Sequence, residues 1–168
     1  SPYSASKASA DLVVRSYHST YGLDTIITRA SNNYGPYQYP EKFIPHLITA
    51  LTQNKKIPLY GNGLNIRDWM YVTDHVEGID RAFHSGKSGE IYNLGGCGQH
   101  PNIEVAQMFL KLHGGGENMI EYVTDRPGHD FRYAVNADKA MRELGWKPKM
   151  SLEEGLRLTW EFYAQSLK

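Results

Sequence analysis

Tyr3 and Lys7 are the first side chains in the sequence whose types and spacing could do chemistry. They lie four residues apart in a segment with helical periodicity, so both fall on one face, with Cβ atoms roughly 5–6 Å apart. A tyrosine has a pKa of about 10, and lowering it to about 7 takes on the order of 4 kcal/mol. A neighbouring ammonium group supplies part of this, because it favours the phenolate. The pair therefore indicates a general base, although Tyr and Lys at this spacing also occur by chance on many helices.

A second group of polar residues follows a short β-branched segment. Residues 25–30 have the composition of a strand, and Asn32 and Asn33 stand in the turn-rich stretch 31–36 directly after it. Open α/β sheets bind ligands at the carboxyl ends of their strands. Two adjacent amides there could hydrogen-bond a sugar or a cofactor, and turn chemistry alone is the alternative.

Two arginines, Arg67 and Arg126, lie in stretches punctuated by Gly and Pro and beside aromatic residues. A guanidinium binds phosphate oxygens as a bidentate fork. With 18 basic and 18 acidic residues the chain has no global field, so any anion site must be local. The alternative for each arginine is a surface ion pair, for instance with Asp68 or Asp125.

Helical and strand patterns alternate along the chain, which predicts the α/β class. The capping box Ser151-x-x-Glu154 marks the start of the last helix. We find no internal repeat, low-complexity segment or linker. The expected helices span about 5–21, 42–52, 73–83 (capped by Thr73 or Asp74), 102–112, 136–144 and 151–164, and the expected strands 25–30, 57–60, 66–72, 90–94 and 120–123.

Composition excludes several classes of function. The balanced charge argues against nucleic acid or a lipid surface as partner, and no apolar run approaches the roughly 20 residues that span a bilayer. The single cysteine, Cys97, fits a reducing, cytoplasmic compartment. His46, His75 and His113 lack the spacing of metal ligands, so we expect no metal site.

We expect Trp69, Trp146 and Trp160 to be packing residues. The chain opens directly into a helical pattern without an initiator methionine, as a piece of a longer protein would.

The combined motifs resemble the extended short-chain dehydrogenase/reductase superfamily, with Tyr3 and Lys7 as its catalytic pair. Within it, the sequence is most similar to the dTDP-glucose 4,6-dehydratase family. The Tyr/Lys pair is shared by the superfamily, whereas Asn32-Asn33-Tyr34-Gly35-Pro36-Tyr37 and Arg126-Pro127-Gly128-His129-Asp130 are much narrower. The resemblance covers essentially the whole chain and is carried by residues 1–8, 29–37, 40–42, 60–63, 66–69, 92–96, 125–130 and 144–148.

The resemblance implies an organisation for the chain. Residues 1–35 would be the remnant of an NAD-binding Rossmann domain, the C-terminal part of a doubly wound fold. Residues 36–168 would form a small mixed α/β domain that binds a sugar nucleotide. It further implies NAD as cofactor, dTDP-glucose as substrate, the N-terminal half of the same enzyme as a further partner, and a homodimer.

The resemblance also implies roles for individual residues. Tyr3 would take a proton from the sugar's 4-hydroxyl while hydride passes to NAD, and Lys7 would lower the tyrosine pKa and hold the nicotinamide ribose. Asn33 would contact the nicotinamide end. The substrate-binding residues would be Asn32, Lys42 and Phe43 along the glucose and phosphate path, Arg67, Arg126 and His129 at the diphosphate, and Pro58, Leu59, Tyr60 and Asn102 on the nucleoside side.

Two motifs of the family are absent from the 168 residues: the Gly-rich cofactor loop and the Thr-Asp-Glu segment whose carboxylates carry out dehydration. The run 114–116 follows a helix instead of opening one and is no substitute. Two alternatives stay open. One is a nucleotide-sugar epimerase or decarboxylase of the same superfamily, which needs no such carboxylates. The other is a nucleotide-sugar-binding module without catalysis.

Overall fold

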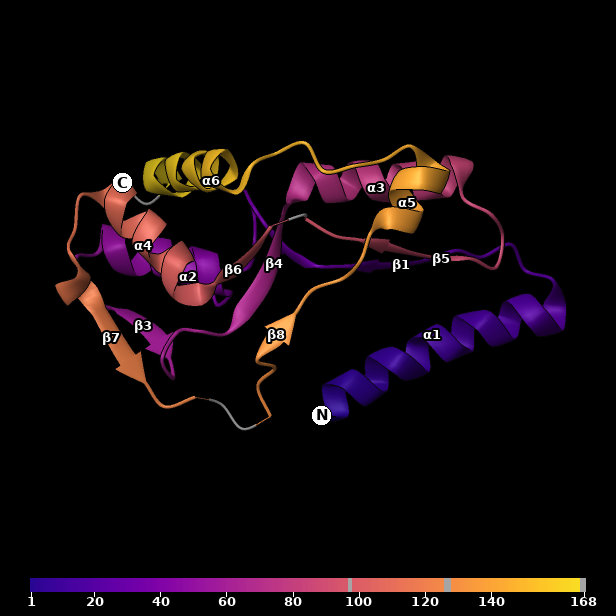
Figure 1. Cartoon of the computed structure of the whole chain (residues 1–168), viewed down its shortest axis with the longest axis horizontal. Helices are drawn as coiled ribbons and strands as arrows, with labels where there is room; N and C mark the ends of the chain where they lie inside the picture. Colours follow the sequence, from indigo (N-terminus) through magenta and orange to yellow (C-terminus); the bar gives the residue numbers. More distant parts are fainter. Residues whose placement is uncertain (97, 126–127, 167–168) are drawn as a thin grey trace.

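The computed structural model describes residues 1–96, 98–125 and 128–166 (Figure 1). Helices and strands alternate, which confirms the predicted α/β class. The α-helices are α1 Pro2–Tyr21, α2 Phe43–Thr52, α3 Val72–Ser85, α4 Asn102–His113, α5 Asp138–Leu144 and α6 Leu152–Ser166, with a 3₁₀ turn, η1, at Glu117–Met119. The strands are β1 Ile27–Ala30, β2 Asn32–Tyr34, β3 Ile57–Tyr60, β4 Ile66–Tyr71, β5 Ile91–Leu94, β6 Gln99–Pro101, β7 Ile120–Val123 and β8 Arg132–Tyr133.

The strands form small, mostly parallel sheets. β1 pairs with β5 and β3 pairs with β7, both in parallel. The central β4 pairs in parallel with β2 and β8 and antiparallel with β6. β4 therefore gathers segments that are far apart in the sequence, and the candidate site is built around it.

A first core lies where α2, α4 and α6 pack together beside β3 and β4 (Figure 1). α2 presents Ile44, Leu47, Ile48 and Leu51, all essentially buried. Its Pro45 lies in the first turn, where a missing N–H leaves no broken hydrogen bond. Trp69 and Trp160 pack at this core as expected.

A second core lies where α3 and α5 pack on the β1–β5 pair. Trp146 is 1% exposed, and its indole N–H donates to the carbonyl of Asp74 at 2.9 Å, which confirms its expected packing role. The Asp74 carboxylate accepts the N–H groups of Lys149 and Met150. The prediction that Thr73 or Asp74 caps α3 was therefore wrong. The helix begins at Val72, and Asp74 instead ties the segment before α6 to α3.

α1 differs from the other helices because none of its residues is buried. In Figure 1 it lies as a separate rod alongside the β1–β5 pair. Asp11 links it to the strand through an ion pair with Arg29 at 2.7 Å. Gly22 ends the helix in the left-handed conformation, at φ 66°, as a glycine C-cap does.

Two segments differ from the sequence-based expectation. The stretch after β1, expected as a turn, contains β2, because Asn32 and Asn33 pair with Trp69 and Met70 of β4. α5 begins at Asp138 and not at Asn136, because the Asn136 side chain accepts the N–H of Asp138 and so precedes the helix.

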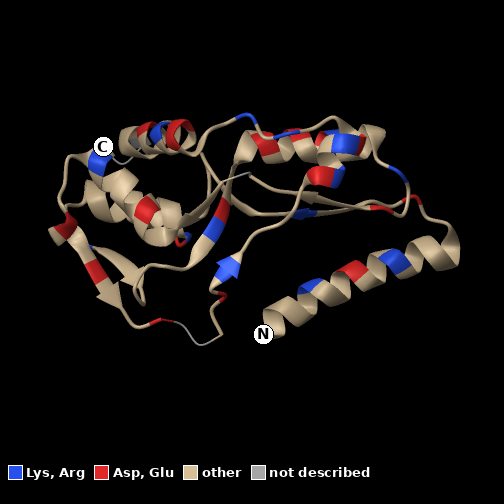
Figure 2. Cartoon of the chain, in the orientation of Figure 1, with Lys and Arg blue, Asp and Glu red and all other residues tan. Residues whose placement is uncertain are grey.

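The parallel β1–β5 pair joins strands from both sides of residue 35. The division into residues 1–35 and 36–168 remains a prediction. Figure 2 shows Lys and Arg interspersed with Asp and Glu over the helices, in keeping with the balanced composition. None of the described helices is long and apolar enough to cross a membrane.

Candidate functional site

Arg67 is the charged centre of the site. It lies on β4, only 8% exposed, so its guanidinium is held inside the protein. Its Nη2 donates to the carbonyl of Asp130 at 2.7 Å and contacts Nε2 of His129 at 2.9 Å, and Nη1 donates to the carbonyl of Ile66 at 2.7 Å. Together with a longer bond from Nη1 to the carbonyl of Phe131, these contacts fix the guanidinium in one orientation and engage its terminal N–H groups.

His129 is oriented by Asp125. Its Nδ1 lies 2.7 Å from Oδ1 of Asp125, so Nδ1–H donates to the carboxylate and Nε2 is left to accept from Arg67. The ring also meets that of Tyr60 edge-on, with centroids 6.2 Å apart. We call Arg67, Asp125 and His129 the arginine cluster. It joins β4 to the segment after β7, and the diphosphate roles expected for Arg67 and His129 remain predictions.

A surface ion pair with the neighbouring Asp68 is the alternative role for Arg67. That carboxylate is 2% exposed and turns to the backbone, accepting N–H from Gly96 and Gly98. Burial raises the pKa of Asp68, and the two N–H donors offset part of the rise. Asp68 therefore holds the segment after β5 against β4, and Arg67 is no surface residue.

The asparagine pair, Asn32 and Asn33, reaches the same strand through β2. Asn32 is opposite Trp69 and Asn33 is opposite Met70, so Asn32 lies beside a position two residues beyond Arg67 on β4. The side-chain oxygens Oδ1 of both asparagines are buried and accept no hydrogen bond from the described residues. A buried acceptor without a donor is costly, so these oxygens are suited to a donor from a ligand or from a further segment of protein.

Lys42 and Phe43 stand at the start of α2. The Phe43 ring stacks on Trp69, with centroids 5.8 Å apart and planes 19° apart, which places it on the β4 side of the helix. Lys42 is exposed and is the N-cap residue, with an extended backbone. Phe43 therefore lies next to the strand that carries Arg67, and Lys42 precedes it in the chain.

The residues expected on the nucleoside side come from two elements that meet. Pro58, Leu59 and Tyr60 form β3, and Asn102 opens α4, whose Ile103 donates its N–H to the carbonyl of Gly63 just after β3. Leu59 is 1% exposed and packs in the core, so it can offer a ligand only backbone groups. Oδ1 of Asn102 is buried without a donor among the described residues.

Tyr3 and Lys7 are not brought to this site. Both lie on α1, and Tyr3 is 73% exposed. Arg126 lies outside the described residues, as does Cys97. Their predicted roles stay predictions. In the described parts of the chain no group of three His, Cys, Asp or Glu side chains is placed to hold a metal ion.

Sequence reasoning missed three residues that hold the site together. Asp125 orients His129, and their i,i+4 spacing was a readable signal. Gln38 donates to the carbonyl of Asn33 at 2.7 Å, and the Tyr133 hydroxyl donates to the carbonyl of Ala30 at 3.1 Å. The last two bonds join segments to backbone carbonyls, and no residue pattern announces such a contact.

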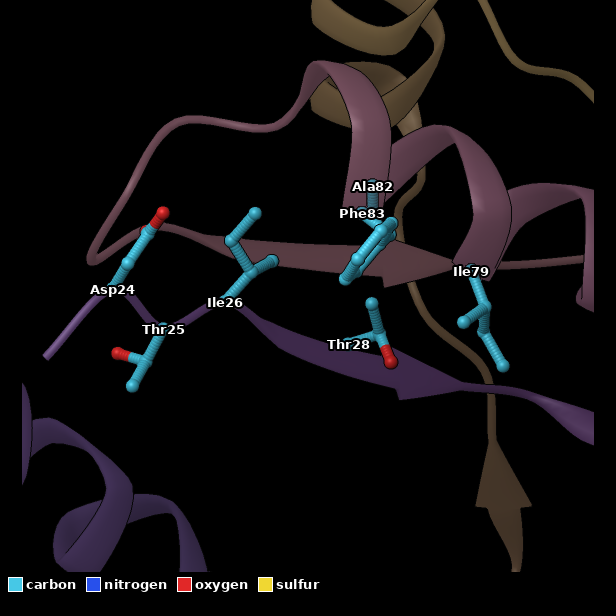
Figure 3. Close-up of a pocket in the computed structure, with 7 residues that line it drawn as sticks. All are labelled: Asp24, Thr25, Ile26, Thr28, Ile79, Ala82 and Phe83. Atoms are coloured by element: carbon cyan, nitrogen blue, oxygen red, sulfur yellow. The ribbon is translucent and has the colours of Figure 1, made fainter.

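Two hollows on the molecule lie away from the arginine cluster. One, of about 240 Å³, lies between β1 and α3, where Ile79 and Phe83 are on the side of α3 and Thr28 is on the side of β1 (Figure 3). The other, of about 470 Å³, lies beside Asp68, Arg132 and Asn136. None of the predicted site residues lines either hollow.

The comparisons with known proteins define the protein family to which the chain belongs. The family model described as GDP-mannose 4,6 dehydratase matches residues 1–159. The chain belongs to this family, within the extended short-chain dehydrogenases/reductases.

The similar proteins are more specific than the family. The dTDP-glucose 4,6-dehydratase of Shigella flexneri is 50% identical over 97% of the chain, and that of Streptomyces griseus is 48% identical over 97%. The chain spans about half the length of these curated relatives, 47% and 50%.

Similar solved structures include enzymes of the same name as these curated relatives. The dTDP-glucose 4,6-dehydratase of Bacillus anthracis in complex with NAD matches 98% of the chain and 52% of its own, with a TM-score of 0.94 and 53% identity. The enzyme of Streptomyces venezuelae, with NAD and TYD bound, matches 98% of the chain and 51% of its own, with a TM-score of 0.95 and 46% identity. The UDP-glucose 4-epimerase of Thermotoga maritima shares the fold, with a TM-score of 0.94 over 99% of the chain and 54% of its own, at 28% identity.

Proposed function

We propose that this chain is the sugar-nucleotide-binding part of a NAD-dependent dTDP-glucose 4,6-dehydratase and works together with a further segment that holds most of the cofactor. The observation that carries the proposal is the 48–50% identity to curated dTDP-glucose 4,6-dehydratases over 97% of the chain. The identity to the structurally similar epimerase is much lower, at 28%.

The arginine cluster suits the anionic part of such a substrate. A nucleoside diphosphate sugar carries two negative charges, and in this proposal its phosphate oxygens pair with the Arg67 guanidinium by taking over contacts that it now makes with backbone carbonyls and His129. Lys42 at the start of α2 adds a point charge nearby. In this proposal Arg126 and His129 complete the diphosphate site, while β3 and Asn102 meet the nucleoside.

The residues present fit one end of NAD. The unpaired buried Oδ1 of Asn33 suits an N–H donor such as the carboxamide of nicotinamide, and Lys7 suits the hydroxyls of a ribose. Bound NAD supplies a hydride acceptor that returns the hydride later, so it is a recycled cofactor. The phosphates of NAD need a Gly-rich loop, which these 168 residues do not contain.

The chain's own residues would act on the sugar as follows. Tyr3 removes the proton from the 4-hydroxyl, and the Lys7 ammonium on the same helix face stabilises the phenolate that does so. Asn32 binds the glucose ring. The 4-keto group then makes the C5 proton acidic, so water can leave from C6, and the groups that assist this step lie outside the present chain.

A second candidate is a nucleotide-sugar epimerase or decarboxylase, because the epimerase structures share the fold. A third is a binding module without catalysis. Incubation of the full-length protein with NAD and dTDP-glucose distinguishes them when mass spectrometry is combined with proton NMR of the sugar, which separates an epimer from unchanged substrate. Loss of water gives the 4-keto-6-deoxy sugar, an epimer keeps the mass, decarboxylation requires a uronic acid substrate, and a module leaves the substrate unchanged while binding it.

Tyr3→Phe tests the proposed base. It should lower the turnover of the full-length enzyme by on the order of 10²–10⁴, because it removes the hydroxyl that accepts the proton. Tyr21→Phe, on the same helix, is the matched control and should leave turnover unchanged. The isolated 168-residue chain should show no dehydration. Unchanged turnover in Tyr3→Phe would exclude Tyr3 as the base.

A further inference from the structure

The loop after β2 has a strained backbone. Tyr37 has a φ of 61°, in the left-handed region that non-glycine residues rarely adopt, and its side chain is 89% exposed. Such strain persists only where surrounding contacts impose it, and it is concentrated at functional sites. The loop begins directly after the asparagine pair, so its conformation bears on where those two side chains lie.

The contacts that impose this conformation come from α6. The Phe162 ring lies against the Tyr37 ring, with centroids 4.8 Å apart. The hydroxyl of Tyr163 donates to the carbonyl of Gln38 at 2.7 Å. Burial raises the pKa of Tyr163, which keeps the hydroxyl protonated and able to donate. Adjacent residues of one helix therefore hold two adjacent residues of the loop.

The same loop is also bonded to the asparagine pair. Nε2 of Gln38 donates to the carbonyl of Asn33 at 2.7 Å. The other end of α6 reaches the same strand, because the Tyr34 hydroxyl donates to the carbonyl of Leu152 at 3.4 Å. Two hydrogen bonds thus link Tyr163 to Asn33 through residue 38, one at the backbone carbonyl of Gln38 and one at its side-chain amide.

We propose that Gln38 and Tyr163 are positioning residues, through which α6 fixes the backbone of Asn33 and so the placement of the Asn32 and Asn33 amides around sugar and nicotinamide. This proposal rests on the proposed function. Neither residue touches a reacting atom. The proposed diphosphate and nucleoside contacts lie on β4, β3, α4 and the segment after β7, outside the two hydrogen bonds. Turnover should therefore depend strongly on these bonds, and substrate binding, to which Asn32 contributes only one of several contacts, should depend on them weakly.

The test is steady-state kinetics of the full-length enzyme with Gln38→Leu, Gln38→His and Tyr163→Phe. Gln38→Leu keeps the bulk but removes the donor, and kcat should fall roughly tenfold or more because misplacement of reacting groups is costly, while KM for dTDP-glucose stays within about twofold. Gln38→His keeps a planar N–H donor and should restore most of kcat. Tyr163→Phe should lower kcat less, and its effect should be smaller in the Gln38→Leu background than alone, because both changes act on Asn33 through residue 38.

Gln53→Ala, an exposed glutamine at the end of α2, is the control and should behave as wild type. A Gln38→Leu enzyme with unchanged kcat, or with KM raised in step with the loss, would overturn the positioning role. An inactive wild type would instead overturn the proposed function. Hydrogen exchange of residues 32–38 then decides the positioning alone: faster exchange in Gln38→Leu supports it, and equal exchange refutes it.

Discussion

At the scale of single residues, the geometry of Arg67 matters more than its charge. Its guanidinium contacts His129 and three backbone carbonyls at the same time, so its orientation is fixed. A lysine keeps the charge and loses the fork. The residue-scale consequence is that even a substitution that conserves charge should impair the site.

Arg67→Lys in the full-length enzyme should weaken dTDP-glucose binding by about 1.5–3 kcal/mol, roughly ten- to a hundredfold, because charge-assisted hydrogen bonds to phosphate are lost. Thymidine, which has no phosphate, should lose far less. Isothermal calorimetry with both ligands measures the difference. Arg81→Lys, an exposed arginine on α3, is the control. Equal losses for the two ligands would show that Arg67 does not face the diphosphate.

His75 on α3 should make stability depend on pH. Burial lowers its pKa in the folded chain, while in the unfolded chain it titrates near about 6.5. Between that pH and the lower folded-state pKa the unfolded chain binds more protons, so the free energy of unfolding falls as pH decreases from about 6.5 toward the folded-state pKa. Urea unfolding between about pH 7.5 and about pH 5.5 should show a smaller decline for His75→Gln than for wild type. His84→Gln, at an exposed site, should not reproduce this effect, and a parallel decline in all three would contradict it.

At the scale of elements, Gly155 allows α6 to pack closely against Tyr34 of β2. A Cβ at Gly155 would clash with the hydroxyl of Tyr34 and lie 2.9 Å from its Cζ, so the absence of a side chain lets the buried ring sit under the helix. Helical glycines usually cost stability relative to alanine, by roughly 0.5–1 kcal/mol. Here close packing accounts for the glycine.

Gly155→Ala should therefore destabilise the chain by about 1–3 kcal/mol, the usual range for overpacking, instead of stabilising it. Adding Tyr34→Phe removes the atom that clashes first and should recover part of the loss, although Tyr34→Phe alone also loses the bond to Leu152. Urea unfolding of the two single variants and the double variant measures this coupling. Additive losses would mean that the two residues do not compete for space.

The elements that the sequence predicts well are those with a local signal. The helices α2, α4 and α6 follow from apolar periodicity, and Glu154 donates its N–H to Ser151 Oγ as the capping box required. Adjacent asparagines favour turns, so the sequence predicts a turn at the residues that form β2. They form a strand because they pair with β4, which lies more than 30 residues later in the sequence. β6 and β8 also depend on β4 and have no pattern of their own.

The candidate site could be predicted only in part, for the same reason. The residue types of Arg67 and His129 indicated an anion site, but the contact between them spans 62 positions and depends on the fold. The positions of Gln38 and Tyr163 are set by a bond across 125 positions. Motifs therefore identify which side chains can bind, and tertiary packing decides which residues hold them in place.

At the scale of the whole molecule, two apolar surfaces stand uncovered. On α1, Val13, Tyr17 and Tyr21 share a face at i,i+4 spacing and are each more than half exposed. On α3, Ile79 and Phe83 border the hollow next to β1, which among the described residues pairs only with β5 (Figure 3). Large exposed apolar patches and open strand edges are sites of association.

We therefore expect the isolated 168-residue chain to self-associate, with an apparent mass that rises with concentration in sedimentation velocity. Placing two carboxylates on the apolar face of α1, in Val13→Glu with Tyr17→Glu, should reduce this association because a charge is costly to bury at an interface. Ser16→Glu with Ser19→Glu adds the same charge to exposed polar positions of the same helix and should leave association unchanged. A wild-type chain that stays monomeric at every concentration would refute the expectation. Equal relief by both pairs of substitutions would show that net charge, and not the apolar face of α1, controls association.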